Sequence, residues 1–211
     1  MRLVLIGARA DGQAHLVLDT LTDGVAHEVV AFLDETPELW NTNVHGIPVL
    51  GPPAAIDTVS ALGVRGGMIS IGSGRARERL AEFLEKAGLD QPSIVHPRAY
   101  VAPSARLGRG IFVGVHAVIS TGATIGDLAL VPPTAFVSHH VAVGTAASLS
   151  PGVKLAGRSR IGCRAFVGLG AIVLPDKRVG DDAVVGAGSV VIDDVPPGAT
   201  VAGVPARVVK S

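Results

Sequence analysis

Residues 113–131 read VGVHAVISTGATIGDLALV, and in this stretch an aliphatic side chain returns at every sixth position. The same spacing continues without an insertion through seventeen consecutive positions. The residue four places after each aliphatic one is usually alanine, and a glycine often follows the aliphatic residue directly. The aliphatic positions are Val95, Val101, Leu107, Val113, Ile119, Ile125, Val131, Val137, Val143, Leu149, Leu155, Ile161, Val167, Val173, Val179, Val185 and Val191.

A period of six residues belongs neither to an α-helix, whose period is 3.6, nor to an alternating strand, whose period is 2. It is typical of a parallel β-helix, in which each hexapeptide forms one strand and one corner and three hexapeptides form one triangular coil. The aliphatic side chain fills the narrow interior, where only a small second residue fits. We therefore predict an all-β, left-handed parallel β-helix over residues 93–211, left-handed because the known hexapeptide coils depart from the usual right-handed crossover.

Residues 1–92 follow a different pattern, because short apolar stretches alternate there with amphipathic ones. This alternation predicts an α/β domain with a small parallel sheet of Rossmann type. The expected strands are residues 2–6, 29–33, 47–50 and 68–71, and the expected helices are residues 13–21, 54–62 and 75–87.

The composition excludes several classes of protein. The 18 basic and 18 acidic residues balance, and no basic run is present, so we expect no nucleic-acid partner. The apolar runs are too short to predict a membrane span, and the N-terminus shows no signal-peptide pattern. A single cysteine, Cys163, cannot form an internal disulfide and favours a cytoplasmic location.

The last repeats lead into segments that are typical of hexapeptide acyltransferases: residues 185–191 (VGAGSVV), 194–197 (DVPP) and 203–207 (GVPAR). With its α/β domain, the whole chain resembles the bacterial nucleotide-aminosugar N-acetyltransferase and sialic acid O-acetyltransferase family. Members of that family join a Rossmann-like nucleotide-sugar-binding domain to a hexapeptide β-helix. The resemblance implies acetyl-CoA as co-substrate, a nucleotide-linked aminosugar as acceptor, and no metal.

The loop of residues 7–12 (GARADG) lies between an expected strand and an expected helix, where backbone N–H groups and the helix dipole suit a phosphate. We take Gly7, Ala8, Arg9 and Gly12 as substrate-binding residues on this ground. Relatives usually carry a more glycine-rich loop with a histidine at the position of Asp11, whose carboxylate repels a pyrophosphate. A simple turn between strand and helix is the alternative interpretation.

Asp34 follows the second expected strand and matches the family position whose carboxylate accepts hydrogen bonds from the nucleotide base. A carboxylate suits uracil, thymine or guanine, since each base offers N–H donors. We add its neighbour Glu35, and Ser73 at the end of a later strand, to the substrate-binding residues. Asp34 as a cap or turn residue, and Ser73 as a helix N-cap, are the alternatives.

Residues 137–141 (VSHHV) match the family segment that contains the catalytic histidine, which makes His139 the predicted general base. An amino or hydroxyl group must lose a proton to attack a thioester, and neutral imidazole accepts a proton near pH 7. His140 stands where relatives have an acid, and Ser148 where they commonly have a second histidine near the thioester. The carboxylate that would stabilise the His139 imidazolium is then expected from a neighbouring chain, with Asp127 a candidate. The alternative is that catalysis relies mainly on the alignment of the two substrates.

Gly157 matches the glycine whose N–H contacts the acetyl oxygen in the family, a role in which one donor stabilises the developing oxyanion. An ordinary corner glycine is the alternative. The resemblance places the pantetheine arm and adenine of coenzyme A along the later coils, and it places the 3′-phosphate near the basic C-terminus. The cofactor-binding residues expected from it are Ser148, Gly157, Gly168, Gly170, Ala187, Pro205, Ala206 and Arg207, with Lys210 beside them.

The leading interpretation is the transfer of acetyl from acetyl-CoA to the amino group of a nucleotide-linked 4-amino-4,6-dideoxysugar. His139 acts as base, His140 is its neighbour in the site and Gly157 holds the oxyanion. O-acetylation of sialic acid or another sugar is one alternative, and a non-catalytic nucleotide-sugar-binding β-helix is another. We expect a homotrimer, because an outward corner residue needs a second wall to form a pocket and cyclic closure supplies one.

Overall fold

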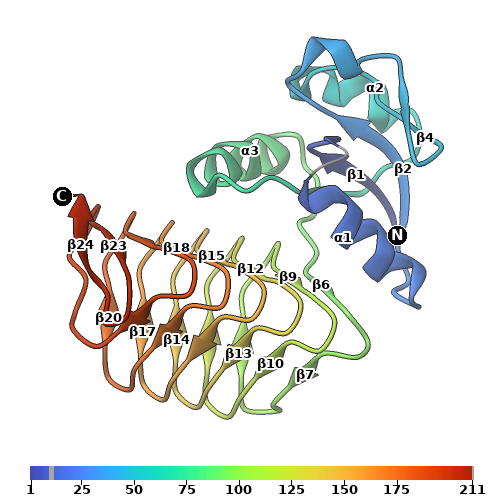
Figure 1. Ribbon diagram of the computed structural model, residues 1–211. Coiled ribbons are helices and arrows are strands. Elements are labelled where there is room, and N and C mark those ends of the chain that lie inside the picture. The colour runs from blue at the N-terminus through green and yellow to red at the C-terminus, as the bar shows by residue number, and fades with distance from the viewer. Residues whose placement is uncertain (10–11, 211) are drawn as a thin grey trace. The chain divides into compact units, whose positions relative to one another are not determined.

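The computed structural model describes residues 1–9 and 12–210, and the chain separates into two compact units, Met1–Ile94 and Val95–Ser211. The expected repulsion between Asp11 and a pyrophosphate concerns a residue outside the described ones. The α/β domain and the parallel β-helix that the sequence predicts are both present (Figure 1). In the described part of the chain, no helix has the length and apolar character needed to cross a bilayer.

The first unit contains a three-stranded parallel sheet in the order β2-β1-β5, with three α-helices around it (Figure 1). All four apolar residues of β1 that follow Arg2 are buried, and they form the centre of this sheet. The strands are β1 (Arg2–Ile6), β2 (Glu28–Leu33), β5 (Gly66–Ile69) and the hairpin of β3 (Asn43–Val44) and β4 (Ile47–Pro48). The helices are α1 (Gln13–Thr22), α2 (Ile56–Ser60), α3 (Gly74–Lys86) and the 3₁₀ turns Pro37–Leu39 and Pro53–Ala55.

Three expected elements of this unit differ from the structure by more than one residue at an end. The expected helix 54–62 is a 3₁₀ turn followed by the five-residue helix α2, and Gly63 beyond it adopts a positive φ of 71°. The expected strand 47–50 is only the hairpin strand β4, after which Val49 forms a single parallel bridge to Phe32. The strand expected to end at residue 71 ends at residue 69, because the Ser70 hydroxyl donates to the carbonyls of Ile6 and Gly7 and starts a loop.

The second unit is a parallel β-helix whose strands are only two residues long over most of its length. Each strand pairs with the strand eighteen residues later, as Val137 does with Leu155, so every coil lies on the one before. We name the three sheets the six-stranded face (β7, β10, β13, β16, β19, β22), the five-stranded face (β8, β11, β14, β17, β20) and the eight-stranded face (β6, β9, β12, β15, β18, β21, β23, β24). The strands are β6 (Ile94–Val95), β7 (Tyr100–Val101), β8 (Arg106–Leu107), β9 (Phe112–Val113), β10 (Val118–Ile119), β11 (Thr124–Ile125), β12 (Leu130–Val131), β13 (Phe136–Val137), β14 (Ala142–Val143), β15 (Ser148–Leu149), β16 (Lys154–Leu155), β17 (Arg160–Ile161), β18 (Phe166–Val167), β19 (Ile172–Val173), β20 (Arg178–Val179), β21 (Val184–Val185), β22 (Val190–Val191), β23 (Thr200–Ala202) and β24 (Arg207–Lys210).

The interior of the β-helix is filled by the aliphatic and alanine positions of the repeat. Ile119, Ala123, Val137 and Leu155 are fully buried, and they belong to one continuous core. The corners have a second regularity: at every sixth position from residue 110 to residue 188 the backbone has a φ between 54° and 73°. This left-handed conformation favours glycine, yet His140 adopts it with a φ of 57°. The side chains at these positions differ in exposure, since His140 is exposed whereas Leu128 and Ala146 are buried.

Candidate active site

His139 and His140 follow strand β13 at the corner between the six-stranded and five-stranded faces. We name this the histidine corner, and it comprises residues 138–140, 156–158 and 174–176 of three successive coils. Both imidazoles are exposed, and their Nδ1 atoms lie 3.2 Å apart with the ring planes inclined at 78°. Two adjacent imidazoles are therefore in direct contact at the surface of the β-helix.

Gly157 lies one coil beyond His139, directly against its ring. A Cβ atom at residue 157 would lie 2.5 Å from Cε1 of His139 and closer still to Nε2, so any side chain would displace the imidazole. The backbone continues the contact, because the N–H of Arg158 donates to the carbonyl of His139 at 3.0 Å. The observed position of the His139 ring therefore depends on the lack of a side chain at residue 157, whose φ is not in the left-handed region.

The N–H group of Gly157 is available to a ligand. Its carbonyl accepts a hydrogen bond from the N–H of Asp176 at 3.1 Å, but no described group accepts from its own N–H. Gly157 is buried, and a buried N–H without a partner is uncommon in folded proteins. The corner therefore combines an imidazole with an unpaired backbone donor, the two groups that acyl transfer to an amine needs.

A carboxylate that the sequence analysis did not identify also lies at this corner. Asp176 accepts two hydrogen bonds from the Arg158 guanidinium, at 2.6 Å and 2.8 Å. The hydrogen bond from Arg158 is the main cause that lowers the pKa of the Asp176 carboxyl, and the nearby charge of His139 contributes to the same effect. The eighteen-residue coil was the available signal, since His140, Arg158 and Asp176 are spaced by eighteen.

Asp127 lies at a different corner of the chain from His139. Its carboxylate accepts from the N–H of Arg109 at 3.0 Å and forms an ion pair with the Arg109 guanidinium at 3.5 Å. This corner joins the five-stranded and eight-stranded faces. Within one chain, Asp176 and not Asp127 is the carboxylate at the histidine corner.

The expected cofactor residues lie away from the histidine corner. Gly168, Gly170 and Ala187 occupy the corner between the eight-stranded and six-stranded faces, which we name the glycine corner. The C-terminal hairpin adjoins it, because the N–H of Ala206 donates to Val190 and the N–H of Gly203 donates to the hydroxyl of Ser189. The structure thus brings together Gly168, Gly170, Ala187, Pro205 and Ala206.

Two further expected cofactor residues have partners of their own. Ser148 is buried on strand β15 of the eight-stranded face, the third face of the coil that carries His139. Arg207 forms an ion pair with Asp193 at 3.5 Å and donates to the carbonyl of Ala206, while Lys210 ends strand β24 and is exposed. One chain therefore does not place Ser148 beside His139.

The first unit has a cavity of about 150 Å³ at the carboxyl ends of β1 and β5. Helix α1 starts there with Gly12 as N-cap, which has no side chain to satisfy the first N–H groups of the helix. The lining residues are Gly7, Arg9, Gly12, Gln13, Ser70, Ile71 and Gly72. Nε2 of Gln13 is buried and has no hydrogen-bond partner among the described residues, so this donor also remains available.

Arg77 places a positive charge beneath this cavity. It is 1 % exposed, and its guanidinium donates to the carbonyls of Ile71 and Gly72 at 2.9 Å and 2.8 Å. Burial lowers the pKa of Arg77 to about 10, which still leaves the side chain charged at neutral pH. The sequence analysis missed Gln13 and Arg77, because helix residues give no local signal of which loop they support.

Asp34 connects two loops of the first unit. It is buried, its Oδ2 accepts from the N–H of Ala8 at 2.6 Å, and its Oδ1 accepts from the N–H of Thr36 at 2.8 Å. The second of these bonds is a turn of the kind that Asp commonly makes with a residue two places on. Ser73 caps helix α3 and accepts from the N–H of Ala76 at 3.4 Å. Both side chains thus have the structural role that the sequence analysis kept as an alternative.

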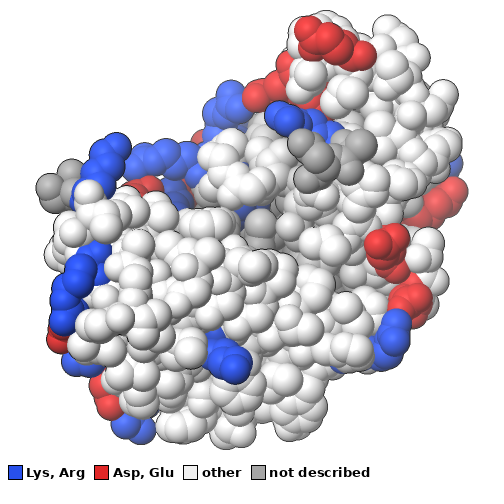
Figure 2. Space-filling view, viewed as in Figure 1, with Lys and Arg blue, Asp and Glu red and all other residues white. Residues whose placement is uncertain are grey.

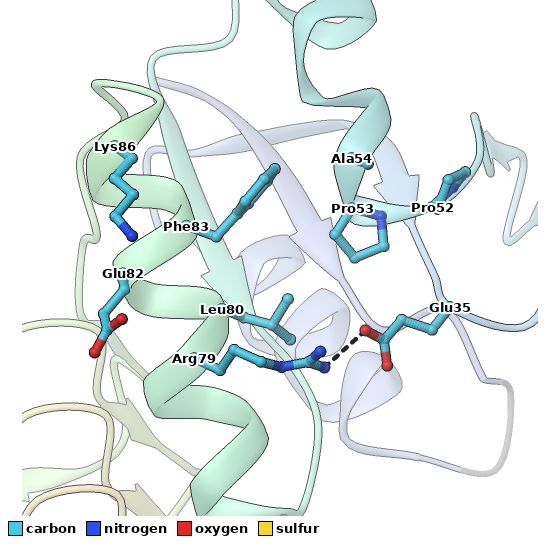
Figure 3. Close-up of a pocket in the computed structure, with 9 residues that line it drawn as sticks. All are labelled: Glu35, Pro52, Pro53, Ala54, Arg79, Leu80, Glu82, Phe83 and Lys86. Atoms are coloured by element: carbon cyan, nitrogen blue, oxygen red, sulfur yellow. Dashed lines mark hydrogen bonds and ion pairs between the residues drawn. The ribbon is translucent and has the colours of Figure 1, made fainter.

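Glu35 lines the larger cavity of the first unit, about 550 Å³ in volume, between helix α3 and the Pro52-Pro53 turn (Figure 3). Its carboxylate accepts a hydrogen bond from Arg79 at 2.7 Å at the mouth of this cavity. Leu80 and Phe83 of α3 project toward the prolines and give the cavity apolar walls (Figure 3). Apolar walls with a few polar groups are typical of small-molecule sites.

A parallel β-helix that carries an imidazole beside a free backbone N–H, in one chain with an α/β unit that has a cavity at the ends of its parallel strands, is typical of a hexapeptide-repeat acyltransferase. Residues 2–84 match the family model described as the PglD N-terminal domain. No curated protein matches the chain.

Several solved structures are similar over the whole length of the chain. A histidine-to-asparagine variant of perosamine N-acetyltransferase from Caulobacter crescentus, in complex with CoA and GDP-perosamine, is 34% identical, with 100% of this chain and 98% of that chain covered and a TM-score of 0.94. The acetyltransferase domain of PglB from Neisseria gonorrhoeae, in complex with acetyl coenzyme A, is 32% identical over 99% and 98%, with a TM-score of 0.90. WeeI from Acinetobacter baumannii is 25% identical over 99% and 100%, with a TM-score of 0.79. The chain belongs to the family of acetyl-CoA-dependent nucleotide-aminosugar N-acetyltransferases with a PglD-like N-terminal domain.

We predict that Gly157→Ala lowers kcat/KM for acetyl transfer by at least about 10-fold, because the added methyl group displaces the His139 ring and a misplaced catalytic group costs rate steeply. The fold should persist, since residue 157 has an ordinary backbone conformation. Steady-state kinetics and thermal unfolding of both proteins check this. Wild-type kinetics in the alanine variant would show that the contact between Gly157 and His139 has no role in catalysis.

Proposed function

We propose that the chain transfers acetyl from acetyl-CoA to the amino group of a nucleotide-linked 4-amino-4,6-dideoxysugar, with GDP-perosamine as the first acceptor to test. The observation that carries the proposal is the contact of Gly157 with the His139 ring beside an unpaired N–H. The similarity to a perosamine N-acetyltransferase over the full length of both chains supports the choice of acceptor. The free thiol of Cys163 suits a reducing compartment, and we propose a cytoplasmic location on this ground.

In the proposed reaction the neutral sugar amine attacks the carbonyl carbon of the thioester, and a C–N bond forms as the C–S bond breaks. Nε2 of His139 takes the proton that the amine loses and then delivers it to the departing thiolate, which leaves as free coenzyme A. The N–H of Gly157 stabilises the negative charge that develops on the acetyl oxygen, an effect worth about 3 kcal/mol for one donor. No acyl-enzyme is needed.

The first unit holds the acceptor in this proposal. The N–H groups at the start of α1, together with Gln13 and the buried charge of Arg77, favour the diphosphate at the smaller cavity. The base occupies the larger cavity, where Glu35 accepts from the N–H groups of a guanine edge. Asp34 then acts indirectly, by fixing the loops that hold Ala8 and Thr36.

The active site is proposed to be shared between chains of a homotrimer. The outer side of the six-stranded face carries mostly apolar side chains, with Tyr100 56 % exposed and Phe136 42 % exposed. In Figure 2 the visible side of the β-helix is largely uncharged, and basic side chains gather toward its C-terminal end at the left. The six-stranded face separates the histidine corner from the glycine corner, so a second chain is needed to bring Ser148 or a glycine corner to His139.

We predict that His139→Asn lowers kcat by about 10²- to 10⁴-fold near pH 7 while binding of both substrates persists, because a positioned general base is worth that factor. Thiol release from acetyl-CoA with GDP-perosamine measures the rate, and calorimetry measures binding. UDP- and dTDP-linked aminosugars and free sialic acid complete the panel of acceptors. A variant that keeps wild-type kcat/KM between about pH 6 and pH 9 would rule out His139 as the base.

Glu35→Gln is predicted to weaken binding of GDP-perosamine by about 10- to 100-fold, the value of hydrogen bonds to one charged group. Its melting temperature should not change, because the ion pair between Glu35 and Arg79 is exposed and contributes little. Asp34→Asn should instead weaken binding of GDP-perosamine and also lower the melting temperature, because the N–H of Ala8 loses its carboxylate acceptor. Affinity for coenzyme A is the control. Unchanged acceptor binding in Glu35→Gln would exclude it as the base reader.

Light scattering at micromolar concentration is expected to give three times the chain mass of 21.4 kDa. Phe136→Glu should dissociate the trimer and abolish turnover, because a charge replaces an apolar contact on the six-stranded face. Thr124→Glu, an exposed change on the five-stranded face, is the matched control. A wild-type protein that is monomeric and fully active would refute the shared site.

A further inference from the structure

The residue that follows His139 in the sequence is a histidine and not an acid, and its ring is a close neighbour of the His139 imidazole. Where the family resemblance places an acidic residue, His140 presents its Nδ1 3.2 Å from Nδ1 of His139. A contact at this distance between two ring nitrogens requires one of them to donate a proton and the other to accept it. The protonation of one ring therefore determines the tautomer of the other.

We propose that His140 is a positioning residue whose Nδ1 accepts a hydrogen bond from Nδ1–H of His139 and so keeps Nε2 of His139 free to take the acceptor's proton. The proposal deepens the function proposed above and rests on it, since it assigns how the general base is held in its basic tautomer. His140 contacts no substrate in this assignment and acts only through His139.

The direction of the hydrogen bond follows from the reaction. If His140 donated instead, Nε2 of His139 would carry a proton and could not act as base. After His139 accepts the amine proton, both of its nitrogens carry hydrogen, and Nδ1–H still points at the lone pair of His140. The same arrangement therefore serves the resting and the protonated states, and neither ring has to turn between them.

Two glycines on adjacent coils leave room for the two rings. A Cβ at Gly157 would displace His139, and a Cβ at Gly122 would lie 2.9 Å from Cδ2 of His140. The backbone adds a further restraint, because the N–H of His140 donates to the carbonyl of Thr121 at 2.9 Å. The pair is thus fixed from both sides along the β-helix.

Charged groups lie on the coils that follow the pair. Arg158 lies one coil beyond His140 and Asp176 two coils beyond it, and the two form an exposed ion pair. Lys177 follows Asp176 in the sequence. His140 is neutral when it accepts, so it orients the imidazolium without neutralising it. Asp176 supplies the negative charge, and its carboxyl interacts with the charge of His139.

Three substitutions of His140 test the proposal in the full-length chain. His140→Asn and His140→Asp keep an oxygen that can accept near the position of Nδ1, so kcat/KM should stay within about threefold of wild type. His140→Leu removes the acceptor and should lower kcat by about 10- to 100-fold with little change in KM, as expected for loss of an orienting partner. Leucine is compatible with the corner, because Leu128 adopts the same left-handed conformation with a φ of 62°.

Nitrogen NMR of the histidine rings provides a readout that a purely structural role would not change. In the wild-type protein with ¹⁵N-labelled histidine above neutral pH, His139 should show a protonated Nδ1 and an unprotonated Nε2. The Leu variant should shift His139 toward the Nε2–H form that free histidine prefers, and the Asn variant should not. Assignment uses the spectra of the His139→Asn and His140→Leu proteins.

The double variant His139→Asn/His140→Leu separates failure of this proposal from failure of the proposed function. If His140 acts through His139, the double variant should be no slower than His139→Asn alone. A fully active His140→Leu protein, or an Nε2–H tautomer in the wild type, overturns the positioning role while His139→Asn still tests the base. A wild-type rate in His139→Asn rules out His139 as the base, and no thiol release from acetyl-CoA by the wild-type protein with any acceptor of the panel overturns the proposed function.

Discussion

The narrow triangular interior of the β-helix is the constraint on which the rest of the second unit depends. Only an aliphatic residue and a small residue fit inside per hexapeptide, so the chain returns to the same position every eighteen residues. Val137 pairs with Leu155 for this reason, and their side chains are fully buried. Each inward side chain packs between the equivalent side chains of the neighbouring coils. An added methylene group in this core is therefore costly to stability.

The same stacking places the chemical groups of the histidine corner. His139 lies over Gly157 because the two residues are eighteen apart, and Arg158 and Asp176 are placed by the same spacing. Most backbone groups of the described coils already bond to neighbouring coils, so corner side chains are free for other contacts. The eighteen-residue repeat of the β-helix thus brings together the proposed base His139, the N–H of Gly157 and the ion pair of Arg158 with Asp176. No long loop is needed to bring them together.

The first unit achieves its arrangement in another way. The parallel strands end at the same edge of the sheet, and single buried side chains connect the loops that follow these strands. Asp34 connects the loop that follows β1 to the loop that follows β2. Ser70 and Arg77 fix the loop that follows β5. Asp34 and Arg77 support a cavity that they do not line, whereas Glu35 lines a cavity directly, which is why Asp34 and Glu35 are expected to differ in their effects.

The sequence by itself determined the two-domain architecture, the inward residues of the β-helix and the family, because a period of six has no other economical explanation and needs only local information. It also predicted His139 and Gly157 as site residues, through the segments in which the chain resembles the family. Only the tertiary structure decided that Asp34 accepts from two backbone N–H groups, that Asp176 lies at the histidine corner and that His140 contacts His139. These three contacts depend on the direction of a side chain and on which distant segment lies beside it. Neither property produces a repeating pattern in the sequence.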